Sequence, residues 1–146
     1  IALGAEEAFA AGLLHDVDYE RLGGDMDQHG LVSAEMLEGV LPEECLHAIR
    51  AHNPMTGAEA TSLLDRALLC ADAVSGLIVA AALVMPGRRL SEVKVGTLKR
   101  RMKDRSFARG VSRDRIRACS EIGLSLEEFL EIALEAMKEV HGQLGL

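Results

Sequence analysis

The ten residues Ala11-Gly12-Leu13-Leu14-His15-Asp16-Val17-Asp18-Tyr19-Glu20 place a histidine and an aspartate side by side at the end of an apolar run. The helical pattern then breaks at Gly23-Gly24. Neighbouring side chains on a helix point about 100° apart, so in mid-helix they rarely share one target. At a frayed last turn they can converge. His15 and Asp16 are therefore a candidate pair of ligands for one cation.

Three further residues with ligating side chains follow, each at the edge of an expected helix or on an apolar helix: His29, His52 and Asp72. Imidazole nitrogen and carboxylate oxygen together suit a divalent first-row metal. An acid on an apolar helix is costly unless it is paired, hydrogen-bonded or bound to metal. The alternatives are ordinary ones, because His29 could cap a helix and a protonated His52 would suit a helix C-terminus.

The order of these residues resembles the HD superfamily of metal-dependent phosphohydrolases. Gly12-Leu13-Leu14-His15-Asp16 is similar to the usual form of its motif, and Ala71-Asp72-Ala73 is similar to the helix that supplies its last aspartate. Longer runs resemble an HDIG-type bacterial subgroup of predicted hydrolases, namely Asp18-Tyr19-Glu20, Ile49-Arg50-Ala51-His52-Asn53 and Lys103-Asp104-Arg105-Ser106-Phe107-Ala108-Arg109-Gly110.

This resemblance implies an all-α, HD-domain-like helical bundle that holds one or two divalent ions (Fe, Mn, Mg, Zn, Ni or Co) where helices converge. It implies that His15, Asp16 and Asp72 hold a first ion, and that His29 and His52 share a second ion with a bridging Asp16. Many relatives carry His-His where this chain has His52-Asn53, which leaves the second ligand set open.

Two acids near these residues have competing interpretations. Asp18 is a candidate catalytic residue beside Asp16, since it could orient a ligand histidine or handle a proton. It could equally be a solvent-facing acid after a helix. Asp65 could support His52 or pair with Arg50 or Arg66.

Composition favours packed helices. Of the 146 residues 49% are hydrophobic but only 3% are aromatic, so the core is built from Leu, Ala, Val, Ile and Met. The three cysteines are odd in number and form no CxxC pair, which predicts buried thiols in a protein of the reducing cytoplasm. The longest apolar run, from Leu77 to Met85, is too short to span a bilayer.

HD proteins carry a first metal-binding histidine on a helix upstream of the His-Asp pair. No histidine precedes His15, and the first residue is Ile1 rather than methionine. We therefore expect residues 1–146 to be a single HD-type helical domain that lacks its N-terminal helix.

Periodicity and capping residues predict the helices. Pro42 suits a first helical turn, Pro86-Gly87 ends a long apolar helix, and Ser125-Leu126-Glu127-Glu128 is a capping box. No segment alternates as a strand would. One or two short helices are expected between Arg88 and Arg117, and another short helix over residues 113–122. The other helices are expected over residues 5–18, 31–40, 42–52, 62–85 and 125–143.

The stretch from Arg88 to Arg117 holds 12 of the 16 Lys and Arg but only 3 acids, a net charge of +9, which leaves −16 for the remainder. It is either a solvated basic face or a phosphate-binding element. For the second interpretation we predict Lys103 and Arg109 as substrate-binding residues, held by the nearby Phe107. Four other arginines are expected to be solvated: Arg88, Arg89, Arg113 and Arg115.

The resemblance to the HD superfamily implies hydrolysis of a phosphoester, with a nucleotide as one candidate, by metal-activated water. The expected partner is a small phosphorylated substrate, not a membrane; a net charge of −7 and few aromatic residues argue against nucleic acid. A non-catalytic HD-like module for binding or signalling is the alternative, and a nuclease using the basic stretch is a third. Substrate, metal identity and oligomeric state stay open.

Overall fold

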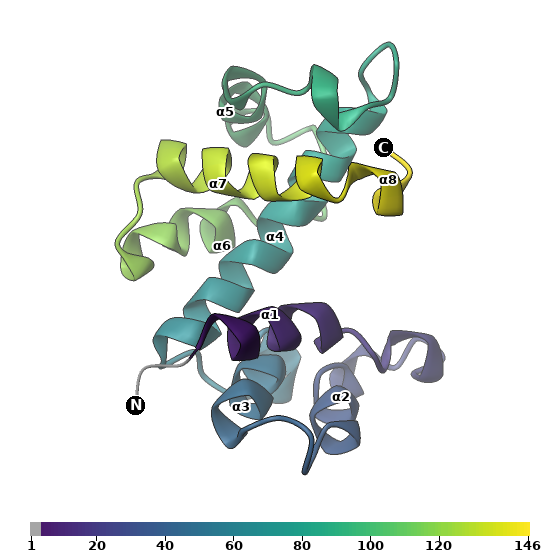
Figure 1. The fold of residues 1–146 in the computed structure, drawn as a ribbon, viewed down its shortest axis with the longest axis vertical. Coiled ribbons are helices and arrows are strands. Elements are labelled where there is room, and N and C mark those ends of the chain that lie inside the picture. Colours follow the sequence, from purple (N-terminus) through teal and green to yellow (C-terminus); the bar gives the residue numbers. More distant parts are fainter. Residues whose placement is uncertain (1–3) are drawn as a thin grey trace. The chain divides into compact units, whose positions relative to one another are not determined.

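The structure, a computed structural model, describes residues 4–146, and these residues form α-helices and short 3-10 helices without any strand (Figure 1). The predicted all-α class is confirmed. The chain divides into two compact units, the first ending at Leu69 and the second beginning at Cys70.

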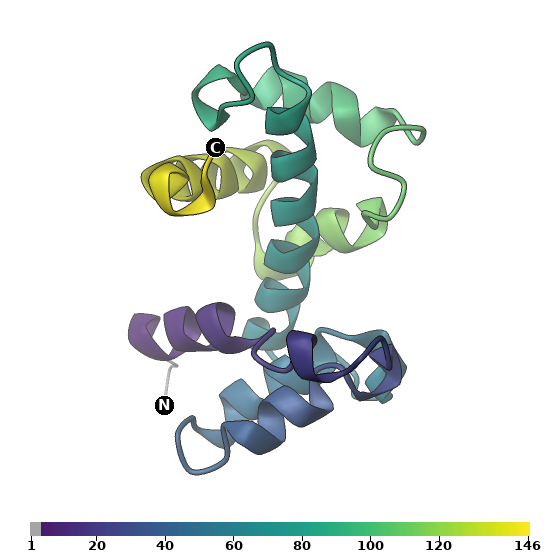
Figure 2. The same cartoon turned by 90° about the vertical axis from the view of Figure 1, so that its right-hand side faces the viewer.

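The first unit packs three short helices and the start of a long one around a small apolar core. Its helices are α1 (Ala5–Leu14), α2 (Leu31–Met36), α3 (Glu43–Ala51) and the opening turns of α4 (Leu63–Leu83), with 3-10 turns at Tyr19–Arg21, Met26–Gln28 and Pro54–Thr56. Figures 1 and 2 both show α2 and α3 side by side. The core between them is formed by Ala34, Leu37, Leu46, Ala48, Ile49 and Leu68.

Helix α1 ends at Leu14, earlier than the predicted end at residue 18. The backbone tightens after it, where the Val17 N–H donates to the Leu14 carbonyl. Asp18 then turns inward and is fully buried, which a continued helix would not allow. Of its small residues, Ala11 is buried in the first unit whereas Ala8 is exposed.

Helix α4 begins with a reciprocal cap between Ser62 and Asp65. The Asp65 N–H donates to Ser62 Oγ, and Asp65 Oδ2 accepts from the backbone N–H groups of Thr61 and Ser62 at 2.9 and 2.8 Å. The same oxygen lies 3.0 Å from His47 Nδ1. Arg50, one of the partners considered for Asp65, pairs instead with Glu43.

By length and composition, α4 is the one helix among the described residues that could cross a membrane. Its apolar side chains Val74, Leu77 and Ile78 are instead buried in the core of the second unit. Burial among protein side chains accounts for the apolar character of this part of the helix.

The second unit gathers its helices around the rest of α4. They are α5 (Val95–Lys103), α6 (Arg113–Arg117), α7 (Leu126–Glu139) and α8 (His141–Leu144), with 3-10 turns at Leu90–Glu92 and Ala118–Ile122. The predicted capping box of α7 is confirmed, because Ser125 Oγ accepts from the Glu128 N–H while Glu128 accepts from the Ser125 N–H. Phe129, Leu130 and Leu134 of α7 pack into the core.

The three cysteines are buried and free, as predicted. Burial raises the pKa of the Cys70 thiol to about 11. These thiols therefore behave as small apolar side chains.

Candidate metal centre

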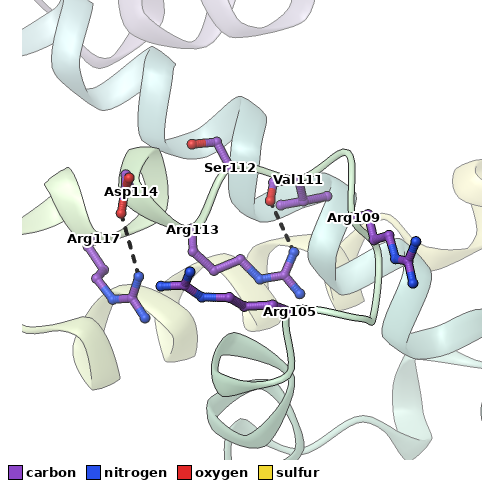
Figure 3. Close-up of a pocket in the computed structure, with 7 residues that line it drawn as sticks. All are labelled: Arg105, Arg109, Val111, Ser112, Arg113, Asp114 and Arg117. Carbon is purple, nitrogen blue, oxygen red and sulfur yellow. Dashed lines mark hydrogen bonds and ion pairs between the residues drawn. The ribbon is translucent and has the colours of Figure 1, made fainter.

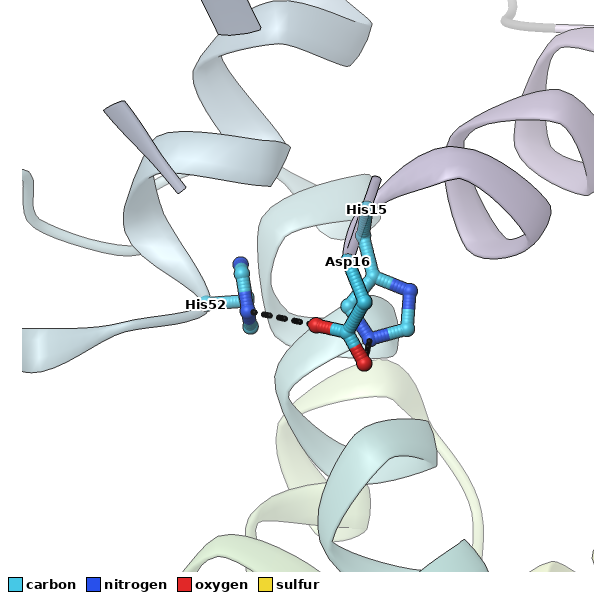
Figure 4. A group of neighbouring side chains, drawn as sticks. All are labelled: His15, Asp16 and His52. Carbon is cyan, nitrogen blue, oxygen red and sulfur yellow. Dashed lines mark ion pairs between the residues drawn. The ribbon is translucent and has the colours of Figure 1, made fainter. Parts of the chain in front are cut away.

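His15 and Asp16 follow directly after the last turn of α1, and their side chains converge. His15 Nε2 lies 3.2 Å from Asp16 Oδ2 (Figure 4). The tightening of the backbone after Leu14 brings the two neighbours onto one side. This is the geometry expected of adjacent residues at a helix end.

Two more imidazoles approach the other oxygen of Asp16. His29, which follows the turn Met26–Gln28, brings Nε2 to 3.1 Å from Asp16 Oδ1. His52, the residue that ends α3, brings Nε2 to 3.6 Å from that oxygen and 3.1 Å from His29 Nε2. We call His15, Asp16, His29 and His52 the His–Asp centre.

In all three histidines the other ring nitrogen faces an oxygen that can only accept a hydrogen bond. Nδ1 of His15 meets the Gly12 carbonyl at 2.7 Å, and Nδ1 of His52 meets the Ile49 carbonyl. Nδ1 of His29 lies 2.8 Å from Asp18 Oδ1. Each Nδ1 therefore carries a proton, and each Nε2 offers a lone pair whenever its ring is neutral, which is the form that binds a metal.

The His–Asp centre consequently points three nitrogen lone pairs and one carboxylate at a shared space. Such groups repel one another unless a cation lies between them. Ligands held about 2.1 Å from one ion lie about 3.0–3.4 Å apart, close to the 3.1–3.6 Å found here. His15, Asp16 and His52 offer donor atoms that all lie within 4.8 Å of one another. The donor set thus fits a divalent metal ion.

Asp16 is ionised within this cluster. Partial burial raises the pKa of its carboxyl group, but the imidazoles of His15 and His52, when protonated, lower it by more, and the pKa then lies well below its usual range. The Asp16 carboxylate therefore needs no deprotonation at neutral pH before it binds a cation.

Asp18 contacts the Nδ1 side of the His29 ring, which faces away from Asp16. Its carboxylate is fully buried and accepts from the backbone N–H groups of Gly30 and Ser33 at 2.8 and 2.9 Å, besides His29 Nδ1. Burial raises the pKa of Asp18, but the Gly30 N–H and the His29 imidazole outweigh it, so the pKa is lowered. The solvent-facing alternative is wrong. The catalytic role of Asp18 stays a prediction, and its contact is with His29.

Gly30 and Asn53 support the same histidines, a role that the sequence did not indicate for either residue. Gly30 has φ +87°, and a Cβ there would lie 2.7 Å from the Ile49 carbonyl oxygen and 3.3 Å from the His52 ring. The Asn53 amide donates to the carbonyls of Met26 and His29 at 2.8 and 2.9 Å. Asn53, which stands where many HD proteins have a second histidine, thus fixes the loop that carries His29.

Three predicted site residues lie in the second unit. Asp72 is half-buried on α4, Lys103 is the exposed last residue of α5, and Arg109 is exposed in the loop that follows. Their assignments as ligand and substrate-binding residues stay predictions. The expected role of Phe107 fits its surroundings, because it packs against the core while Arg101 lies 4.1 Å above its ring.

Arg113 is not the solvated charge that we predicted. Its guanidinium donates to the backbone carbonyls of Arg101, Asp104, Phe107, Ala108 and Val111. These contacts fix the loop between α5 and α6. The sequence gives no sign of them, because the acceptors are backbone atoms.

Fold and centre together define a helical protein with a histidine–carboxylate site for a divalent cation. The HD domain family matches residues 2–77, about half of the chain, and the protein belongs to that family. HD domains bind divalent metals and are typically metal-dependent hydrolases. No curated protein and no solved structure matches the chain.

Proposed function

We propose that this protein is a metal-dependent phosphohydrolase that acts on a small phosphorylated substrate. One observation carries the proposal. Three imidazoles, each of which uses its Nδ1 proton in a hydrogen bond to another oxygen, place their Nε2 atoms close to the two oxygens of Asp16. Membership of the HD family gives the reaction class.

His15, His29, His52 and Asp16 would hold the metal. A divalent ion bound there supplies a Lewis acid that activates water and offsets phosphate charge. The chain's own contribution is position, because Asp18 keeps the His29 proton on Nδ1 and thereby keeps Nε2 free to ligate. The two oxygens of Asp16 face different histidines, which supports a carboxylate shared between two ions.

The remaining assignments complete the proposal. Asp72 is the further ligand that the family order implies, and Lys103 and Arg109 bind the phosphate of the substrate. A cytoplasmic location is part of the proposal, and the free, buried thiols are its support.

The test is metal analysis of protein purified without chelator or affinity histidines, beside a screen of phosphorylated small molecules for phosphate release. We expect bound divalent metal and metal-dependent release, both lost in Asp16→Asn and reduced in Asp72→Ala. His141→Ala is the matched control, because His141 is exposed on α8.

Absence of metal, with none gained on reconstitution, would contradict the proposed centre. Bound metal without any hydrolysis across the screen would favour the non-catalytic module instead. Equal loss in His141→Ala would mean that the effect of Asp16→Asn is not specific to the centre.

A further inference from the structure

Four arginines line one hollow in the second unit, formed by the loop after α5 and by α6. They are Arg105, Arg109, Arg113 and Arg117, and Asp114 is the one acid among the lining residues (Figure 3). The lining thus carries a net charge of 4 − 1 = +3. We call this hollow the arginine pocket.

The positive charge of the arginine pocket is poorly compensated. Asp114 lies 3.7 Å from Arg117, but its side chain is fully exposed, where an ion pair is weak. Arg105 and Arg109 have no hydrogen bond or ion pair within residues 4–146. Gathered guanidinium groups repel one another unless an anion joins them.

The neighbouring arginines show the contrast. Arg101 lies 3.6 Å from Asp104 and stacks on Phe107. Its charge is thus paired with a carboxylate, and the face of its guanidinium lies against an aromatic ring. The terminal N–H groups of Arg113 donate to five backbone carbonyls, so Arg113 contributes only its charge to the arginine pocket. By fixing the loop that carries Arg105 and Arg109, Arg113 also acts as a positioning residue for both.

The lining selects the charged part of a ligand. Val111 is its one apolar residue, and no aromatic side chain is present on which a base could stack. A guanidinium offers a planar fork that matches the oxygens of a phosphate. We propose that the arginine pocket is a binding site for a phosphate-bearing small molecule, held through its phosphate oxygens by Arg105, Arg109 and Arg117.

Inorganic pyrophosphate is the probe, titrated into the full chain and followed by calorimetry and by amide resonances of residues 104–117. We expect the double variant Arg105→Gln/Arg109→Gln to weaken binding by about tenfold or more, as for the loss of two charge-assisted contacts. The matched control is Arg88→Gln/Arg89→Gln, which removes the same charge from exposed positions outside the arginine pocket.

Equal weakening in the two double variants, fading with added salt, would overturn the site in favour of a diffuse field. Loss of binding in His52→Ala with none in Arg105→Gln/Arg109→Gln would overturn it too, because the probe would then be bound at the His–Asp centre. The binding assay requires no hydrolysis, so its result stands apart from that of the proposed function.

The bound phosphate can belong to the substrate or to a separate effector. Once a substrate is hydrolysed, a raised KM in Arg105→Gln with competitive inhibition by pyrophosphate identifies the substrate. An unchanged KM, with pyrophosphate altering kcat only, identifies an effector.

Discussion

The His–Asp centre gathers three imidazoles and the arginine pocket gathers four guanidinium groups. The two clusters differ in how firmly their side chains are held. In the centre each imidazole has a second contact that fixes its proton, to the oxygens of Gly12, Asp18 and Ile49. In the arginine pocket only Arg113 is held in this way. A prearranged site suits an ion with fixed bond lengths, whereas exposed arginines suit an oxyanion, which can accept hydrogen bonds from several directions.

The difference predicts where substitutions act. Substitution of a residue that supports the histidines should weaken metal binding even though no ligand is replaced, because the supporting contacts orient the imidazoles. Changes among the free arginines should alter ligand affinity but leave the fold intact, since those side chains contribute little to packing.

The largest effect is expected from Gly30→Ala. Its Cβ would lie 2.7 Å from the Ile49 carbonyl oxygen in a residue with φ +87°, so strain and collision add. We expect a loss of about 3 kcal/mol in the free energy of unfolding, measured in urea, together with loss of bound metal.

Gly24→Ala is the control for this variant, because Gly24 has φ +94° and open space around it. It should lose only about 1 kcal/mol, the conformational part, and keep its metal. Equal losses in the two variants would show that the close approach to Ile49 does not matter.

Asp18→Asn comes next. The amide keeps the shape of the carboxylate but weakens its hold on His29 Nδ1, so the metal dissociation constant should rise about 10–100-fold in a competition titration. Asp27→Asn, an exposed change nearby, should leave it unchanged. An unaltered constant in Asp18→Asn would mean that His29 needs no support or is no ligand.

Arg113→Lys tests the held arginine of the pocket. An ammonium cannot reach five carbonyls, so we expect a loss of about 1–3 kcal/mol in stability and faster proteolysis within residues 104–111. Arg105→Lys should change neither measurement. Indistinguishable stability of the two variants would contradict the loop-holding role of Arg113.

The smallest effect concerns pH. Burial raises the pKa of Asp65, but the N–H groups of Ser62 and Thr61 and the His47 imidazole outweigh it, so the pKa is lowered in the folded state. Its stabilisation is complete above the unfolded pKa of about 3.9 and is lost as pH falls through the lower folded value.

Asp65→Asn should therefore destabilise the protein by about 1 kcal/mol at pH 7 and flatten the slope of stability against pH below about pH 4. Thermal unfolding at stepped pH measures both. A slope equal to that of the wild type would show that Asp65 does not titrate with folding.

The sequence predicted much of the fold because its helix signals are local. Ser125 with Glu128 at one helix start and Pro42 at another both stand where the structure begins a helix. Helix α1 was predicted too long, because its end depends on the burial of Asp18, which is decided by Gly30 and Ser33 farther along the chain.

The centre was predictable as a set of ligand types, but its support was not. The motif order pointed to His15, Asp16, His29 and His52, whereas the Nδ1 partners of His15 and His52 are carbonyls that any residue could supply. Arg113 was misjudged for the same reason. Every residue has a backbone carbonyl, so a hydrogen bond to one cannot be predicted from residue types.

The sharing of Asp16 between two sets of histidines limits how this protein can evolve. Because Oδ2 faces His15 while Oδ1 faces His29 and His52, a substitution at Asp16 changes both sides of the cluster together. Only substitution of a histidine can change one side of the cluster without the other. A lineage or a designer that changes one side of the cluster would therefore have to replace a histidine and leave the carboxylate unchanged.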